Sequence, residues 1–239
     1  MKIIVFDFDE CLGNFTFFYE IQNSLTNDID LNFLLDLKIL RPNVEKVFHY
    51  LHTLKKKPLI ILYTNSTYHV PLYVLKIIHK KYKNLFKFVI SRNLYWKWHY
   101  NKWIQLNFKR KFNFVKYIED IFKLVNFDSN SEKFELIMFD DYITRANKNK
   151  YMITPKNKEI KYVVTNKNEG QIYLIPTYAY KQNKNFINKL FNFINTNNLV
   201  LNKKNLNEIR KQFSRTKKNN NDYATSNKFL DYIKIFIKK

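Results

Sequence analysis

Hydrophobic residues along this chain gather in short runs of strand length, separated by stretches in which they recur every three or four residues. The runs occupy residues 2–6, 59–63, 86–90, 134–139 and 171–176. Helical spacing follows Pro42 and returns from Val70, from Val115 and from Phe186. Because strands buried on both faces read as continuous apolar runs, this alternation predicts an α/β fold with a mostly parallel central sheet.

Three segments depart from the alternation. Residues 93–113 form a small basic and aromatic insert after the third strand, and residues 142–171 are rich in Asn and Lys, which indicates a loop. Beyond residue 195 the chain becomes Lys/Asn-rich, so we expect a domain over residues 1–195 and a basic tail over residues 196–239. The tail ends in a short predicted helix that docks on the domain through Phe229, Ile233, Phe236 and Ile237.

The charge balance changes the picture of possible partners. Lys and Arg number 42 against 20 Asp and Glu, and the resulting net charge of +22 attracts polyanions and phosphorylated partners. The abundance of Lys, Asn, Ile, Phe and Tyr also fits an AT-biased genome, in which case much of the charge is a solvated surface.

The single cysteine, Cys11, excludes an internal disulfide framework and fits an intracellular protein, cytoplasmic or nuclear. No apolar run reaches the roughly 18 residues of a membrane span, so no membrane partner is expected.

Polar side chains follow three of the predicted strands at the point where each strand ends. They are Asp7 with Asp9, Thr64, and Asp140 with Asp141. The carboxyl ends of parallel strands meet at one edge of a sheet, where ligands bind, so these side chains are expected to converge. Carboxylates are costly there unless a cation or a reaction uses them. Lys116, which precedes the fourth strand, is the candidate for a positive charge at this edge.

This set of side chains suits phosphoryl transfer. Mg²⁺ prefers oxygen ligands and is usually held by one or two carboxylates together with a substrate phosphate. A carboxylate such as Asp7 can attack phosphorus to form an aspartyl-phosphate, which divides one difficult hydrolysis into two easier steps. A second carboxylate, Asp9, can protonate the leaving oxygen and later deprotonate the attacking water.

The order of these residues resembles the four motifs of the haloacid dehalogenase superfamily of aspartyl-phosphate hydrolases. Within it, the chain is most similar to the NLI-interacting-factor-like group, the relatives of RNA polymerase II C-terminal-domain phosphatases. The segments that carry this second resemblance are residues 40–44, 63–66, 86–92, 114–116 and 174–176. Together the motifs cover roughly residues 1–195. The resemblance implies a three-layer, Rossmann-like haloacid dehalogenase fold.

The resemblance also assigns roles to individual residues. It implies that Asp7 is the nucleophile and a Mg²⁺ ligand, and that Asp9 is the general acid/base, with its main-chain carbonyl on the metal. Thr64 and Asn65 would bind the phosphate, and Lys116 would neutralise it. Asp140 would ligate Mg²⁺, with Asp141 as a supporting or alternative ligand. Lys109 and Lys111 lie close to Lys116 in sequence and are alternatives for the cation, while Cys11 departs from the Thr or Val usual at its position.

The residues and the resemblance together predict a Mg²⁺-dependent phosphatase for phosphoserine and phosphothreonine proteins. There is no room for a large cap between Leu12 and Leu40, and an open site admits a phosphate carried on a macromolecule. One alternative is a nucleic-acid end phosphatase in which Trp96, Trp98 and Trp103 grip a strand by stacking. In the opposing interpretation these rings cover the sheet edge or form a wall for a substrate peptide. A third possibility is a basic binding module without turnover.

Overall fold

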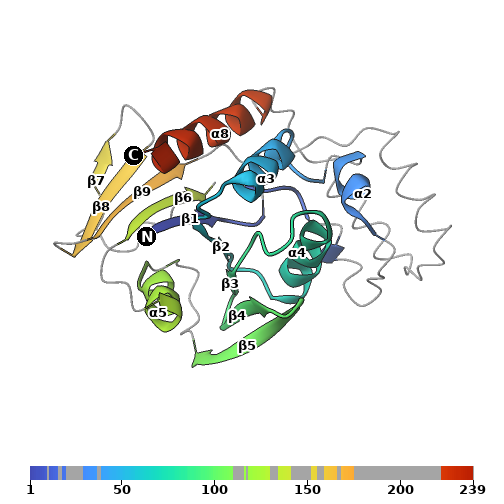
Figure 1. Cartoon of the computed structure of the whole chain (residues 1–239), viewed down its shortest axis with the longest axis horizontal. Coiled ribbons are helices and arrows are strands. Elements are labelled where there is room, and N and C mark those ends of the chain that lie inside the picture. The colour runs from blue at the N-terminus through green and yellow to red at the C-terminus, as the bar shows by residue number, and fades with distance from the viewer. Residues whose placement is uncertain are drawn as a thin grey trace.

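The computed structural model describes residues 1–9, 11–15, 18–19, 29–36, 39–109, 116, 118–129, 134–140, 152–154, 159–165, 168–174 and 222–238. These residues form one nine-stranded sheet in the order β5-β4-β3-β2-β1-β6-β9-β8-β7. The five central strands are parallel: β3 (Phe88–Ile90), β2 (Leu59–Tyr63), β1 (Lys2–Phe6), β6 (Glu135–Asp140) and β9 (Asn168–Leu174). The predicted α/β fold with a parallel centre is therefore confirmed (Figure 1).

Both edges of the sheet are antiparallel. On one side the predicted insert forms a hairpin of β4 (Leu94–His99) and β5 (Lys102–Lys109), which continues the sheet from β3. On the other side β8 (Glu159–Thr165) and β7 (Met152–Thr154) extend the sheet from β9. The prediction of a loop over residues 142–171 is therefore wrong for the described part of that segment. Its Asn- and Lys-rich composition hid the alternation of Ile160, Tyr162 and Val164 that is typical of a strand.

Helices cover both faces of the central strands and create three layers. They are α2 (Leu31–Asp36), α3 (Val44–Thr53), α4 (His69–Lys81), α5 (Ile118–Ser129) and α8 (Asp222–Lys238). Successive residues of a strand point to opposite faces, so Ile4 and Phe6 join a core cluster with α3, α4 and α8, whereas Ile3 and Val5 join a cluster with α5. Figure 1 shows α3 and α8 on one side of the central strands and α5 on the other.

The predicted docking of the last helix is confirmed. Phe229 of α8 is fully buried, and its ring centroid lies 4.7 Å from that of Phe139 on β6. The ammonium of Lys2 donates hydrogen bonds to the carbonyls of Phe236 at 2.5 Å and Ile237 at 3.1 Å, near the end of α8. A cation at this position satisfies carbonyls that have no partner within the helix. The helix predicted from Phe186 and the boundary at residue 195 lie outside the described residues.

Between Leu12 and Leu40 the structure describes residues 12–15, 18–19, 29–36 and 39–40, which include the six-residue helix α2. The absence of a large cap from this segment stays a prediction. None of the helices that the structure describes is long and apolar enough to cross a membrane.

Candidate active site

Asp7 and Asp140 lie side by side at the carboxyl edge of the sheet. Asp140 is the last residue of β6, and Asp7 directly follows β1, whose Phe6 is paired with Phe139 of β6. The Asp7 N–H donates to the Phe139 carbonyl at 2.9 Å, which continues the ladder one residue past the strand. Both aspartates are buried, so each carboxylate needs a partner of opposite charge or a set of hydrogen-bond donors.

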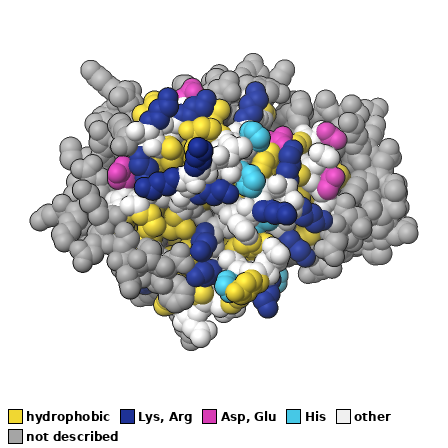
Figure 2. Space-filling model, in the orientation of Figure 1, with side chains coloured by type: hydrophobic (Ala, Val, Ile, Leu, Met, Phe, Trp, Pro, Cys, Tyr) yellow, Lys and Arg dark blue, Asp and Glu magenta, His cyan; other side chains and the backbone are white. Residues whose placement is uncertain are grey.

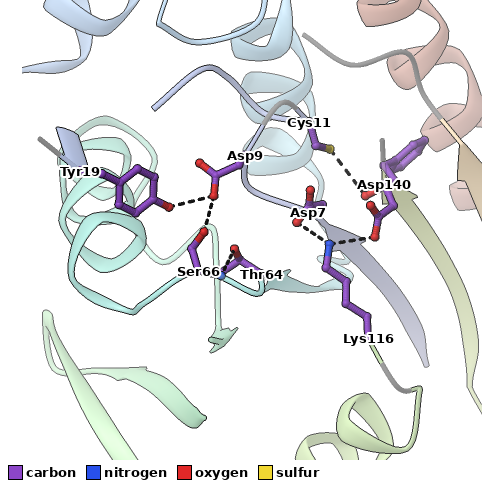
Figure 3. Close-up of polar contacts among 9 residues, drawn as sticks. Asp7, Asp9, Cys11, Tyr19, Thr64, Ser66, Lys116 and Asp140 are labelled. Atoms are coloured by element: carbon purple, nitrogen blue, oxygen red, sulfur yellow. Dashed lines mark hydrogen bonds and ion pairs between the residues drawn. The ribbon is translucent and has the colours of Figure 1, made fainter. Parts of the chain in front are cut away.

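Lys116 is that partner for both aspartates. Figure 3 shows its Nζ between the two carboxylates. The Nζ lies 2.5 Å from Asp7 Oδ1 and 2.8 Å from Asp140 Oδ2. Burial by itself would lower the pKa of Lys116, but the two carboxylates outweigh burial and raise this pKa above its usual value. The ammonium therefore stays charged at neutral pH. Of the three candidate cations, Lys116 is the one whose side chain the structure describes, and it lies at the aspartates. Lys109 ends the edge strand β5, and Lys111 lies outside the described residues.

Asp9 is held by two hydroxyl donors. Its Oδ2 accepts hydrogen bonds from Tyr19 Oη at 2.8 Å and from Ser66 Oγ at 2.5 Å (Figure 3). Burial, and after it the charge of Asp9, raises the pKa of Tyr19 far above its usual value, so this phenol remains a donor. Sequence reasoning did not single out Tyr19 or the side chain of Ser66. Ser66 belongs to the motif after β2, but only the folded chain shows that both hydroxyls meet Asp9.

Thr64 and Asn65 form the loop that follows β2. Thr64 is buried, its N–H donates to the Ile90 carbonyl at 2.8 Å, and its Oγ1 accepts from the Ser66 N–H at 3.0 Å. Arg92, just after β3, fastens the same loop. Its N–H donates to the Ser66 carbonyl at 3.0 Å and its Nε to the Asn65 carbonyl at 3.2 Å. The loop is thus fixed at the same edge of the sheet as the aspartates.

Cys11 is a packing residue beside the site. The buried thiol donates to the Phe139 carbonyl at 3.6 Å, and burial, followed by the charge of Asp7, raises the pKa of Cys11 well above its usual value. A neutral thiol is a poor nucleophile. The fully buried Arg41 donates from Nε to the Cys11 carbonyl at 2.7 Å and fixes the turn after β1. A Cβ at Gly13 in the same turn would lie 2.3 Å from the Ile39 carbonyl oxygen, so this position requires glycine.

A third buried carboxylate, Asp120 of α5, is connected to the site through Tyr63. Its two oxygens accept hydrogen bonds from Tyr63 Oη at 2.5 Å and Tyr95 Oη at 2.6 Å. The ring centroid of Tyr63 lies 6.0 Å from Lys116 Nζ, within the range of a cation–π contact. Asp120 therefore anchors α5 and a tyrosine that borders the catalytic lysine candidate. Nothing in the sequence distinguished it from a surface acid.

The tryptophans of the insert pack toward α4. Trp98 is buried, donates from Nε1 to Asn84 Oδ1 at 2.7 Å, and has its ring centroid 4.4 Å from that of His79. Trp103 is also next to His79, at 5.6 Å, and Trp96 lies 4.7 Å from Tyr68. These contacts agree with the interpretation that the rings cover the sheet edge. A nucleic-acid contact through them stays a prediction.

The described residues contain no group of three or more His, Cys, Asp or Glu side chains placed to hold a metal ion. Asp141, one of the predicted ligands, lies outside the described residues. The carboxylates of Asp7 and Asp140 nevertheless converge on one cation, the Lys116 ammonium. Two hard oxygen donors at one point are the set that Mg²⁺ uses together with a phosphate and water, so the residues present fit this ion.

Comparison with known proteins identified no relative of this chain. No protein-family model matches the chain, and neither a curated protein nor a solved structure matches it. What the site can do follows from its own residues. They can place a carboxylate nucleophile, a second carboxylate held by hydroxyls, and a fixed ammonium around one incoming phosphate.

Proposed function

We propose that the chain is a Mg²⁺-dependent phosphatase that works through an aspartyl-phosphate, with a haloacid dehalogenase fold of the NLI-interacting-factor-like kind. The observation that carries this proposal is the Lys116 ammonium bound between Asp7 and Asp140 at the ends of two adjacent parallel strands. A phosphate that arrives there meets a nucleophile and a positive charge at once. Positioning and charge neutralisation account for most of the catalysis in phosphoryl transfer.

In the first step an Asp7 carboxylate oxygen attacks phosphorus, and the bond between phosphorus and the seryl or threonyl oxygen breaks. Asp9, oriented by Tyr19 and Ser66, gives its proton to the leaving oxygen. In the second step Asp9 takes a proton from water, whose oxygen attacks the phosphorus of the aspartyl-phosphate. Inorganic phosphate leaves, and Asp7 is restored as a carboxylate.

Lys116 and the loop after β2 hold the transferred group during both steps. The ammonium neutralises charge on the phosphoryl oxygens, and Thr64 and Asn65, in the loop fixed after β2, are the proposed hydrogen-bond donors to them. Asp7, Asp140, the main-chain carbonyl of Asp9 and Asp141 are the groups proposed to hold Mg²⁺. When bound, the ion supplies further positive charge for the phosphate oxygens.

The proposed substrate is a phosphoserine or phosphothreonine protein. Two observations support a macromolecular substrate over a small metabolite. The segment between Leu12 and Leu40 is too short to hold a large cap, and the chain is strongly basic, with a net charge of +22. A nucleic-acid end phosphatase would use the same residues, and a binding module would keep the fold without turnover.

The test is Mg²⁺-dependent hydrolysis of p-nitrophenyl phosphate by the wild-type chain and by Asp7→Asn and Asp9→Asn. Asp36→Asn, the same chemical change at an exposed position on α2, is the matched control. We expect turnover by the wild type and the control only. A wild-type chain that is inert with Mg²⁺ present would contradict the proposal. Comparison of a phosphoserine peptide with a 3′-phosphorylated oligonucleotide then separates the two substrate classes.

A further inference from the structure

Acidic residues are absent from a long central part of the sequence. Residues 46–118 contain 16 Lys and Arg but no Asp or Glu, between Glu45 and Glu119. An even spread of the chain's 20 acids would place about six of them in this stretch, so charge is segregated as well as abundant. Figure 2 shows the result in space. Lys and Arg cover the middle of the face in view, where Figure 1 places α3, α4 and the β4–β5 hairpin, and acidic side chains lie at its margins.

Topology gathers several of these lysines at the amino edge of the sheet, opposite the proposed active site. The loop before β2, the end of α4 with the loop before β3, and the turn of the hairpin all lie there. The hairpin turn belongs to this edge because β4 runs antiparallel to β3 and pairs Lys97 with Phe88, the first residue of β3. We name the exposed cations of these segments the lysine edge; they are Lys55, Lys56, Lys57, Lys80, Lys83 and Lys102.

An exposed aromatic residue stands at the tip of the hairpin. Tyr100 is 84% exposed, and the ring of His99 lies 4.0 Å from its ring. Tyr100 and Asn101 both have positive φ, 46° and 59°, as a two-residue hairpin turn of this kind requires. Asn and Gly suit such a turn, whereas a bulky side chain at positive φ is strained. Folding of the turn therefore gives no reason for a tyrosine here, and burial gives none either.

We propose that the lysine edge, with Tyr100 and His99, binds single-stranded nucleic acid. The lysines contact successive phosphates, and the two rings at the hairpin tip stack on unpaired bases. The excess of cations in these segments favours a polyanion, and the exposed rings favour a strand with free bases over an acidic protein. Glu45, which lies beside this edge, is paired with Lys81. This surface is distinct from the packed faces of Trp96, Trp98 and Trp103. It also lies at the other edge of the sheet from Asp7, so the inference does not depend on phosphatase activity.

The test is fluorescence anisotropy of a labelled oligodeoxythymidine of about 20 nucleotides with the full chain over a salt series, with an oligouridine of equal length as the RNA arm. Lys56→Glu/Lys57→Glu alters the lysine edge. Lys123→Glu/Lys238→Glu makes the same change of net charge at exposed positions on α5 and α8 and is the matched control. We expect the first double variant to bind about tenfold more weakly or worse, with a smaller salt dependence, and the control to change less than about twofold.

Tyr100→Asn tests the stacking contribution without harming the turn, since Asn tolerates positive φ. We expect unchanged thermal unfolding and an affinity about fivefold lower. The proposal is overturned if the wild-type chain does not bind at low salt, or if both double variants lose affinity equally. It is also overturned if Tyr100→Asn binds like the wild type, or if polyglutamate of equal charge displaces the oligonucleotide as well as unlabelled oligonucleotide does.

Discussion

Two buried carboxylates, Asp7 and Asp120, differ in the kind of partner that holds them. Asp7 is 6% exposed and Asp120 is 5% exposed. Asp7 faces the Lys116 ammonium at 2.5 Å, whereas Asp120 accepts from the hydroxyls of Tyr63 and Tyr95. In the proposed mechanism the Lys116 ammonium is shared with an incoming phosphate, whereas the phenols of Tyr63 on β2 and Tyr95 on β4 remain donors to Asp120. Equal burial therefore produces one carboxylate that can exchange partners and another that holds the scaffold in place.

Neutralising Asp7 is expected to have the largest effect of the substitutions that distinguish the two carboxylates. We expect Asp7→Asn to lower kcat for p-nitrophenyl phosphate by about 10⁴-fold, since an amide cannot form the covalent intermediate. Thermal unfolding should shift little, because Asp140 still pairs with Lys116. Steady-state kinetics and melting curves check both statements. A variant that loses stability but keeps turnover would reverse the roles of the two carboxylates.

Removal of the shared cation should destabilise the fold. Lys116→Met leaves Asp7 and Asp140 adjacent without the ammonium, and we expect the free energy of unfolding in urea with EDTA to fall by about 3–5 kcal/mol at neutral pH. Mg²⁺ should recover part of this loss, because the two carboxylates then attract a metal cation. The exposed Lys123→Met on α5 is the control and should change stability by less than about 0.5 kcal/mol. A Lys116→Met chain that Mg²⁺ fails to stabilise would count against the proposed metal site.

Substitution of Asp120 should lower the stability of the fold more than it lowers kcat. Asp120→Asn places an amide donor against one of two phenol donors, so we expect a loss of about 2–3 kcal/mol in the free energy of unfolding. Tyr95→Phe removes one hydrogen bond and should cost only about 1 kcal/mol. We expect kcat to fall less than tenfold in both variants while KM changes little. A loss of turnover as large as that of Asp7→Asn would make Asp120 part of the chemistry.

His79 is a buried titratable side chain that the fold keeps neutral. Burial lowers the pKa of His79 to about 3, and its Nε2 accepts the Phe86 N–H at 3.0 Å. The unfolded chain binds a proton near the ordinary pKa of 6.5 while the folded chain does not, so stability is full above that pH and is lost as the pH falls. We expect a loss of about 1 kcal/mol for the first unit below pH 6.5, rising toward 1.4 kcal/mol per unit.

Urea unfolding at several pH values checks this slope. His79→Gln keeps an acceptor for the Phe86 N–H and should flatten the slope, whereas His49→Gln at an exposed position of α3 should leave it unchanged. If His79→Gln and the wild type follow the same pH dependence, another group causes the acid sensitivity.

The contrast between these sites also explains what the sequence can and cannot reveal. Asp7, Thr64 and Asp140 are found because an apolar run locates a strand, and the polar residue after it must lie at the sheet edge. Tyr19 and Ser66 escape the same reasoning, since their meeting with Asp9 depends on how two loops fold over the strand ends. Asp120 escapes because a single acid on an amphipathic helix usually faces solvent.

The central strands could be predicted from the sequence, but the strands at one edge of the sheet and a short helix could not. The parallel centre follows from continuous apolar runs, whereas β7 and β8 lie in a segment whose Asn and Lys content indicated a loop. Edge strands carry many polar residues, so composition is a weak guide to them. The short helix α2 was also missed, because six residues are too few to establish a helical period.

The hydrogen bonds between Lys2 and the end of α8 join the first strand to a helix that is synthesised much later. Lys2 and Phe236 are 234 positions apart, yet they are joined by a hydrogen bond. Phe229, which packs on Phe139 of β6, is also translated long after β1. Until residues 222–238 leave the exit tunnel, the central strands lack one of the helices that cover them. The apolar β1 therefore stays partly uncovered while the residues between it and α8 are made, which lengthens the time in which it can associate with other polypeptides.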